Sequence, residues 1–577
     1  MPDPANDAFV AAARTALDGI LARLPEQATT LGDHRHDDRL TAGAAADYEE
    51  TLRWCGHRLA ELRALDQRGL SAQNRVDLQI LANGLEWVRF KIGELREHEW
   101  NPLIANPGRA IYLLVARDFA PLSERLRCVA RRLAAVPGAL AAARGVLGAM
   151  PVVHLETALS QFAGTAQLIS SELDRFITTA RPRGTTGFGL ADARSAALDA
   201  IAEHRRWLQR RLEEEAARDG GGRDPRIGAE LFARKLQLTL DAPADAAAIT
   251  SRAEADLERV TDEITQTAAR LAGRKHAEPA SPVAAAAAAD RRAGLDGIVR
   301  QVLDSLAADA PDNATILPLV ERAFGQQCAF VREHAVVTIY DDPVEVIEMP
   351  EIDRGVTVAY CDPPGPLETA ALPTFVAVSP TPKDWTGDQT RSFYREYNRH
   401  LVHNLMIHEG MPGHVLQLQH ARRFTGDTLV RAATRSGAFV EGWAIYAEQV
   451  MAAHAYPGDG NPDAIRMQQL KMQLRAIINT IIDARVHGDG MTQAEAMALM
   501  TGRGHQEQAE AAGKWRRALL TSAQLSTYYV GFTQVSDLVT DLRSAHPGLP
   551  QQRLHDMLLA HGSPPVRHLR TLLTGAG

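Results

Sequence analysis

The segment from His408 to His414, read as His-Glu-Gly-Met-Pro-Gly-His, contains the residue types of a zinc hydrolase. Neutral imidazoles bind zinc, and a neighbouring carboxylate such as that of Glu409 can act as a base on its water. The two histidines are six residues apart, so a straight helix would place them on different faces. Pro412 lacks an N–H and crowds the carbonyl four residues earlier, so we expect a kink or bulge over residues 409–413. This break would return His414 toward His408 and predicts two metal ligands. The alternative is a pair of packed core histidines.

A third protein ligand is expected from the stretch GAFVEGWAIYAEQV, where Glu441 and Glu448 share one helix face. One carboxylate from a second helix completes three protein ligands in many zinc proteases and leaves a position for water. We favour Glu441, because Gly442 beside it allows another helix to approach closely. Glu448 is then a candidate acceptor for a histidine N–H. The alternative for either glutamate is a surface ion pair.

Helical periodicity dominates the elements that must position these residues. Three short strands are expected within residues 335–382, where β-branched residues gather. We place a boundary near residue 300, with an N-terminal helical lobe over 1–300 and a catalytic lobe over 301–577. The low-complexity stretch 274–293 is expected to be a linker or a solvated helix. The expected helices are 5–25, 45–68, 71–100, 117–147, 153–179, 189–216, 245–272, 388–422, 428–455, 463–488, 492–501, 506–517, 523–545 and 549–560.

The chain resembles the DUF885 family, whose signature HExxPGH appears here as residues 408–414. Further segments match in order, and they include LGDHRHDDRL, IGAELFARKL, EGWAIYAE, YYVGF and LHDMLLAHGSPPVRHLR. The family is similar to zinc peptidases of the gluzincin type. The resemblance implies His408, His414 and Glu441 as zinc ligands and Glu409 as the general base. It also implies a mainly α fold, two-lobed and metallopeptidase-like, with a central channel and a small β-sheet.

Two further clusters match the family pattern and are candidates for the same site. Asp483 and His487 lie four residues apart, and a histidine held by an aspartate can donate to an oxyanion. Arg485 stands where the family usually has glycine, and its role stays open. The resemblance implies that Tyr528, in the pattern Y-x-x-G, stabilises a tetrahedral intermediate, with less support for Tyr529. The alternatives are a histidine that caps a helix and a tyrosine packed at the core edge.

A third cluster, the stretch GDHRHDD over residues 32–38, suggests a second metal site, but we favour a loop that caps the next helix. Four arginines are candidates to bind a substrate terminus, and nothing in the sequence singles one out: Arg391, Arg395, Arg399 and Arg475.

Composition narrows the possible partners of the chain. The formal net charge is -8 over 577 residues, which gives no overall attraction for nucleic acid. No apolar run is long enough to span a membrane, and the first residues do not read as a signal peptide. The four cysteines form no CxxC pair. We therefore expect a cytoplasmic protein without nucleic-acid or membrane partners, and its oligomeric state is not indicated.

Three hypotheses follow. The first is a zinc-dependent hydrolase that cleaves peptide or peptide-like amide bonds in small substrates, with Glu409 activating water. The second keeps the metal but assigns hydrolysis or elimination of a C–N bond in a specialised metabolite. The third is a non-catalytic helical scaffold. The natural substrate, the choice between endo- and exo-cleavage and the exact metal stay open, since nitrogen and oxygen ligands also accept other metals.

Overall fold

The computed structural model describes residues 4–179, 189–218, 221–273, 297–349 and 358–575, and it is mainly α-helical with one small sheet. The chain forms two compact units. Unit 1 comprises Met1–Ile227, Pro364–Leu372 and Thr425–Thr434, and unit 2 comprises Gly228–Pro363, Pro373–Phe424 and Arg435–Gly577. The expected mainly α fold with a small sheet is confirmed, and the central channel stays a prediction.

The boundary expected near residue 300 differs from this division, which falls between Ile227 and Gly228. Residues 228–273 belong to unit 2 because their two helices pack along a long helix of that unit, over 462–488. The low-complexity stretch 274–293 lies outside the described residues.

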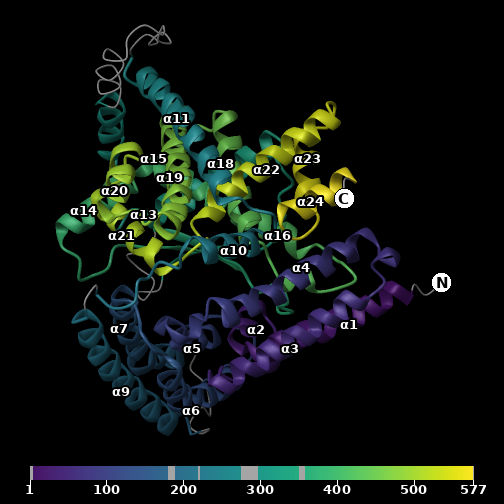
Figure 1. The fold of residues 1–577 in the computed structure, drawn as a ribbon. Helices are drawn as coiled ribbons and strands as arrows, with labels where there is room; N and C mark the ends of the chain where they lie inside the picture. The colour runs from purple at the N-terminus through teal and green to yellow at the C-terminus, as the bar shows by residue number, and fades with distance from the viewer. Residues whose placement is uncertain (1–3, 180–188, 219–220, 274–296, 350–357, 576–577) are drawn as a thin grey trace. The chain divides into compact units, whose positions relative to one another are not determined.

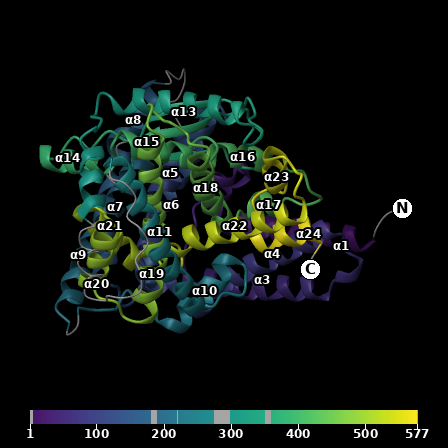
Figure 2. The same ribbon diagram turned by 90° about the horizontal axis from the view of Figure 1, so that it is seen from above.

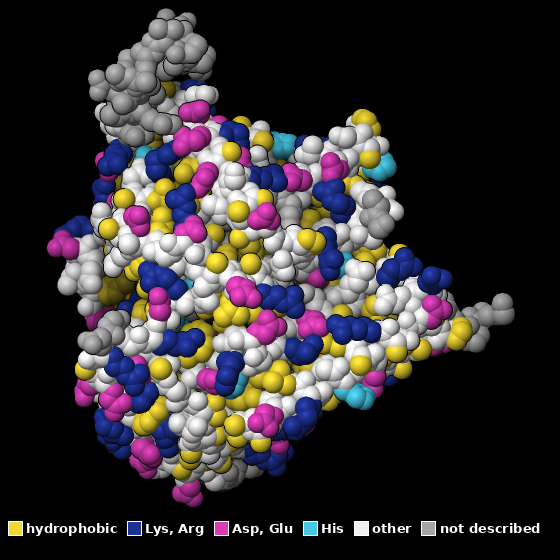
Figure 3. All heavy atoms as spheres, viewed as in Figure 1, with side chains coloured by type: hydrophobic (Ala, Val, Ile, Leu, Met, Phe, Trp, Pro, Cys, Tyr) yellow, Lys and Arg dark blue, Asp and Glu magenta, His cyan; other side chains and the backbone are white. Residues whose placement is uncertain are grey.

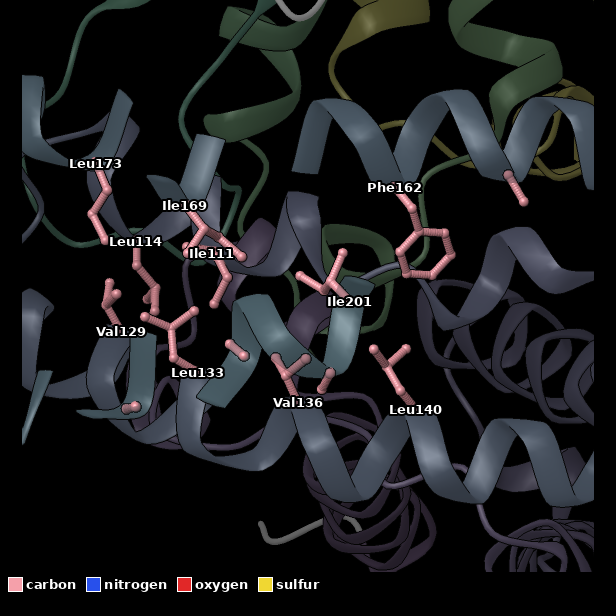
Figure 4. Packing of buried hydrophobic residues seen from close by; sticks show 14 of the residues in the cluster. Ile111, Leu114, Val129, Leu133, Val136, Leu140, Phe162, Ile169, Leu173 and Ile201 are labelled. Carbon is pink, nitrogen blue, oxygen red and sulfur yellow. The ribbon is translucent and has the colours of Figure 1, made fainter. Parts of the chain in front are cut away.

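Unit 1 is built from long helices, and the buried apolar residues of its helices between residues 111 and 208 meet in one core (Figures 1 and 4). Its helices are α1 (Pro4–Arg23), α2 (Pro25–Leu31), α3 (Ala45–Ala64), α4 (Ala72–Arg89), α5 (Gly108–Ala116), α6 (Leu122–Val146), α7 (Val152–Gln167), α8 (Leu173–Thr179), α9 (Leu190–Ala216) and α17 (Val430–Ala433). On α9, Ala193, Ala197, Ala200 and Ile201 recur at helical spacing and are buried against α6 and α7.

Two later segments of the chain complete unit 1. Arg431, in Thr425–Thr434, donates from Nε to Asp77 Oδ1 at 2.6 Å, and both side chains are almost fully buried. In Pro364–Leu372, the amide of Leu367 donates to the carbonyl of Leu31 at 2.8 Å. Both segments are therefore tied to unit 1 by specific polar contacts.

Unit 2 holds the sheet and the remaining helices. Its helices are α10 (Ala229–Leu240), α11 (Ala246–Leu271), α13 (Ile316–Glu333), α14 (Gly387–Glu396), α15 (Arg399–Glu409), α16 (His414–Arg422), α18 (Gly437–Ala453), α19 (Pro462–Gly488), α20 (Gln493–Ala498), α21 (Gln508–Leu520), α22 (Ser526–Ala545), α23 (Gln551–Leu559) and α24 (Val566–Thr574). The strands are β1 (Val344–Glu348), β2 (Ala359–Asp362) and β3 (Thr374–Val378), in the order β1-β3-β2. The central strand β3 pairs parallel to β1 and antiparallel to β2, which confirms the three expected strands.

Helix α18 packs closely on α22 at a pair of glycines (Figure 2). A Cβ at Gly442 would lie 2.2 Å from the carbonyl carbon of Gly531. A Cβ at Gly531 would lie 1.9 Å from the carbonyl oxygen of Ala438. Close approach of another helix at Gly442 was expected, and the structure identifies α22 as that helix.

Two further features concern the surface and the helix types. Acidic and basic side chains are interspersed on the face drawn in Figure 3. Within the described ranges, none of the helices has the length and apolarity needed to cross a membrane.

Candidate metal centre

The HEGMPGH segment forms a break between two helices, as its proline and glycines predict. Helix α15 ends at Glu409 and α16 begins at His414. A Cβ at Gly413 would lie only 1.9 Å from the carbonyl oxygen of His408, so glycine is needed for this close approach. The indole N–H of Trp443, on α18, donates to the carbonyl of Pro412 at 2.9 Å and holds the break against that helix. The expected interruption over 409–413 is confirmed.

The break brings both histidines to one carboxylate. His408 Nε2 lies 3.3 Å from Glu441 Oε2, and His414 Nε2 lies 3.6 Å from the same oxygen. The two imidazole rings are nearly perpendicular, at 83°, with centroids 4.7 Å apart. One potential ligand atom from each of the three residues lies within 4.8 Å of the others, the only such group in the described residues.

These distances agree with a zinc site. Ligand atoms about 2.0–2.1 Å from a tetrahedral zinc ion are separated from one another by about 3.3–3.4 Å. The side chains of His408, His414 and Glu441 remain 12, 10 and 23% exposed, so a small molecule has access to them. Two neutral imidazoles and one carboxylate are the donor set of many catalytic zinc sites. The three residues therefore fit the metal.

Electrostatic interactions within the cluster are strong. Burial alone would lower the pKa of His408, but Glu441 and Glu448 raise it well above its usual value. Burial alone would raise the pKa of Glu441, and the two histidines outweigh it and hold that pKa far below its usual range. Glu441 is therefore ionised at neutral pH, as a metal ligand must be.

Glu448 orients His408. Its Oε1 lies 2.7 Å from His408 Nδ1, and its Oε2 accepts a hydrogen bond from Asn404 Nδ2 at 2.7 Å. A carboxylate on Nδ1 fixes the tautomer in which Nε2 is free to bind a metal. The structure thus places Glu448 where the sequence suggested, as the partner of a histidine N–H.

Glu409 is held by the edge of the sheet. The backbone N–H of Cys361, on β2, donates to Glu409 Oε2 at 3.0 Å. In the described chain Oε1 accepts no hydrogen bond, so one carboxylate oxygen is fixed and the other is available for proton transfer. The contact joins residues 48 positions apart, and no sequence pattern signalled it.

The charge of Glu441 acts on Tyr528, whereas Tyr529 contacts an acid outside the cluster. The negative charge of Glu441, followed by burial, raises the pKa of Tyr528. Its hydroxyl accepts a hydrogen bond from Arg517 Nη2 at 3.3 Å. The hydroxyl of Tyr529 instead donates to Asp256 Oδ2 at 2.6 Å. Arg517 is a second residue that the sequence analysis missed, although it lies in the basic run KWRR.

His487 and Asp483 contact the loop between α21 and α22. His487 Nε2 lies 3.0 Å from the carbonyl of Ala518 and 2.9 Å from that of Thr521. Asp483 accepts hydrogen bonds from the amides of Ala523 and Ser526, and burial raises its pKa to about 6. These contacts match the capping alternative for His487, because Nε2 already donates to the end of α21. Its role at an oxyanion stays a prediction.

Arg485 and the four candidate arginines are engaged in ion pairs with acids. Arg485 pairs with Glu254 on α11. The others pair with acids in the same way: Arg391 with Asp388, Arg395 with Asp304, Arg399 with Asp309 and Asp459, and Arg475 with Glu510.

The fold and the cluster together define a class of protein. It is a mainly helical protein in which two histidines and a glutamate converge in the pattern of a metal site. The chain belongs to the DUF885 family, described as bacterial proteins of unknown function, which matches residues 25–573. The similarity to gluzincin peptidases stays a prediction.

Two solved structures are similar to this chain over almost its whole length. A proposed lipoprotein of unknown function from Shewanella oneidensis is 27% identical, with a TM-score of 0.80, and the match covers 98% of this chain and 99% of that one. A proposed lipoprotein from Colwellia psychrerythraea is 14% identical, with a TM-score of 0.77 and 98% of both chains covered, and it shows the fold alone. No curated protein matches the chain.

Proposed function

We propose that this protein is a zinc-dependent hydrolase that cleaves peptide or peptide-like amide bonds in small substrates. The observation that carries the proposal is the convergence of His408, His414 and Glu441 on one point beside Glu409. A purely structural zinc site would gain little from an additional carboxylate held by the sheet. A catalytic site needs such a group to move protons.

The residues of the chain have distinct tasks in this reaction. His408, His414 and Glu441 would hold zinc, which when bound acts as a Lewis acid and lowers the pKa of water to about 7. Glu409 accepts a proton from the attacking water through its free oxygen and passes it to the leaving amine. Tyr528 donates its hydroxyl hydrogen toward the negative charge that develops on the carbonyl oxygen. Glu448 keeps the His408 ring in its orientation throughout.

A screen of short peptides tests the proposal. The zinc-loaded protein is expected to hydrolyse at least one class of di- to pentapeptides, and chelation of the metal should abolish the reaction. Intact casein should be cleaved much more slowly, since a channel that admits only small substrates is expected from the family resemblance. Equal cleavage of casein would contradict that channel, and no cleavage of any peptide would contradict the proposal.

The same screen includes the alternative reaction. Non-peptide amides represent the C–N bonds of a specialised metabolite. Arg485 was one reason for considering this alternative. It forms an ion pair with Glu254, so its contacts do not favour the alternative. Metal-dependent turnover of these amides alone would replace the peptidase proposal. Localisation in the cytoplasm stays a separate prediction.

A further inference from the structure

Lys514, on α21, is a largely buried lysine. Only 8% of its surface is exposed to solvent. Among the described residues it forms neither a hydrogen bond nor an ion pair. Buried lysines are almost always paired, because an isolated ammonium loses its hydration without compensation. An apolar residue would fill this position on α21 without that cost.

The groups around Lys514 further disfavour its charged form. Burial, and then the positive charges of Arg475 and Arg517, lower the pKa of Lys514 well below its usual value. Arg475 is balanced by its ion pair with Glu510. Arg517 is not balanced in this way, since its Nη2 donates to Gln524 Oε1 at 2.8 Å and to the Tyr528 hydroxyl at 3.3 Å, which are both neutral.

Lys514 and Arg517 are three positions apart, so they are neighbours on one face of α21. No carboxylate of the described chain forms an ion pair with either. The guanidinium of Arg517 carries a positive charge, as arginines in proteins do. The charge of Arg517 is therefore not neutralised by an acid, and an anion bound beside it would favour the charged form of Lys514.

This pair of residues is connected to the candidate metal centre through Tyr528. The Tyr528 hydroxyl contacts Arg517, and the largest influence on its pKa is the charge of Glu441. The backbone explains the proximity, because Tyr528 precedes Gly531 by one turn of α22, and Gly531 packs directly on Gly442, next to Glu441. An anionic group held by the pair would lie beside the metal ligands.

We infer that Lys514 and Arg517 form a subsite for the terminal carboxylate of the substrate. An ammonium and a guanidinium fit the two oxygens of a carboxylate, through charge-assisted hydrogen bonds. The inference rests on the proposed hydrolase function and refines it. A hydrolase with this subsite acts at or near the carboxyl end of short peptides, and it discriminates against the same peptides as amides.

Binding to an inactive protein tests the subsite separately from turnover. The protein is the zinc-loaded Glu409→Gln variant, and the ligands are N-acetylated dipeptides, each made as the free acid and as the C-terminal amide. Calorimetry is expected to show that the acid binds about tenfold or more tightly than the amide, the usual size for hydrogen bonds to a charged group. Adding Lys514→Met should remove most of this ratio and leave the affinity for the amide unchanged. The same substitution at the exposed Lys383 is the matched control and should preserve the ratio.

The possible outcomes separate the subsite from the hydrolase. Equal binding of acid and amide, or a ratio that survives Lys514→Met, would overturn the subsite even if the wild-type protein cleaves both peptides. Selective binding of the acid with no cleavage would support the subsite and contradict the hydrolase. Inorganic phosphate is a third ligand, and if it binds more tightly than every acid the carboxylate assignment fails. Arg517→Gln is a second variant, expected to reduce the ratio in the same direction, in case Lys514→Met does not fold.

Discussion

Among the described residues, two histidines each contact two carboxylates, and one of the two belongs to the candidate metal cluster. In unit 1, His34 Nδ1 lies 2.8 Å from Asp37 Oδ2, and His34 Nε2 lies 2.9 Å from Glu368 Oε2. In unit 2, His408 Nδ1 lies 2.7 Å from Glu448 Oε1, but His408 Nε2 lies 3.3 Å from Glu441 Oε2. The first histidine is saturated by hydrogen bonds, whereas the second shares one oxygen with another imidazole.

The carboxylates around the two histidines also differ in the other hydrogen bonds that they accept. Asp37 also accepts a hydrogen bond from Thr29 Oγ1 at 2.6 Å, and Glu368 accepts one from the amide of Ala370 at 2.8 Å. Glu441 Oε2, in contrast, is buried without a geometrically sound hydrogen bond in the described structure. Histidines and acids close in space are therefore not enough for a metal site. The ligand atoms must converge while their other hydrogen bonds are directed outward.

The largest effect is expected from removing the base while keeping the ligands. Glu409→Gln should retain the metal and lower turnover by about a hundredfold or more, the usual contribution of a general base. The Cys361 amide can still donate to the glutamine oxygen, so the backbone should not move. Steady-state kinetics together with metal analysis checks this. Near-normal turnover in the metal-loaded variant would remove Glu409 from the mechanism.

A smaller effect is expected from the residue that orients His408. Glu448→Gln should lower zinc affinity about 10- to 100-fold, as is typical for a carboxylate that orients a metal-binding histidine. Competition with a chromogenic chelator measures this affinity. The matched control is Glu321→Gln, an exposed position on α13, which should have no effect. An unchanged zinc affinity in Glu448→Gln would mean that the contact between Glu448 and His408 does not orient the histidine for metal binding.

Sequence reasoning predicted the site better where the cause was local. Pro412 and Gly413 predict the helix break because backbone chemistry acts over a few residues. The choice of Glu441 also relied on a local signal, the glycine beside it. The contacts of Cys361 and Arg517 join separate elements through tertiary packing, and they left no pattern in the sequence.

The fold followed the same rule. Long amphipathic helices such as 189–216 agree with the structure almost to the residue, and the three strands were located. The expected helix 428–455 is instead divided into α17 and α18, which belong to different units. Segments that leave one unit for another, such as Pro364–Leu372, depend on contacts with distant residues. Local periodicity carries no information about them.

The histidine of unit 1 should behave as a structural residue. His34→Ala removes one hydrogen-bond donor from Asp37 and one from Glu368, and it should lower the free energy of local opening by about 1–3 kcal/mol. Hydrogen exchange of the amides in 31–38 and 364–372 measures this energy. His57→Ala, at an exposed position of α3, is the control and should change little. Loss of metal from His34→Ala would contradict the assignment of His34 as a structural residue and of His408 as the metal ligand.

The smallest expected effect is the pH dependence of the contribution of His34 to the free energy of local opening. Burial alone would lower the pKa of His34, but Asp37 and Glu368 raise it above the ordinary value of about 6.5. A raised pKa in the folded state stabilises the protein fully below the unfolded value, and the gain is lost as pH rises through the folded value. The difference in opening free energy between wild type and His34→Ala should therefore be larger at pH 5.5 than at pH 8.5. A difference that grows with pH would show that His34 is not held in its charged form.

The metal content of three purified proteins tests the central claim most directly. After zinc is offered and the excess is dialysed away, the wild-type protein should retain about one zinc ion per chain. His408→Ala should retain none, and His34→Ala should retain the same amount as the wild type. Zinc that stays in His408→Ala, or that is absent from all three proteins, would contradict the assignment of His408, His414 and Glu441 as the metal ligands.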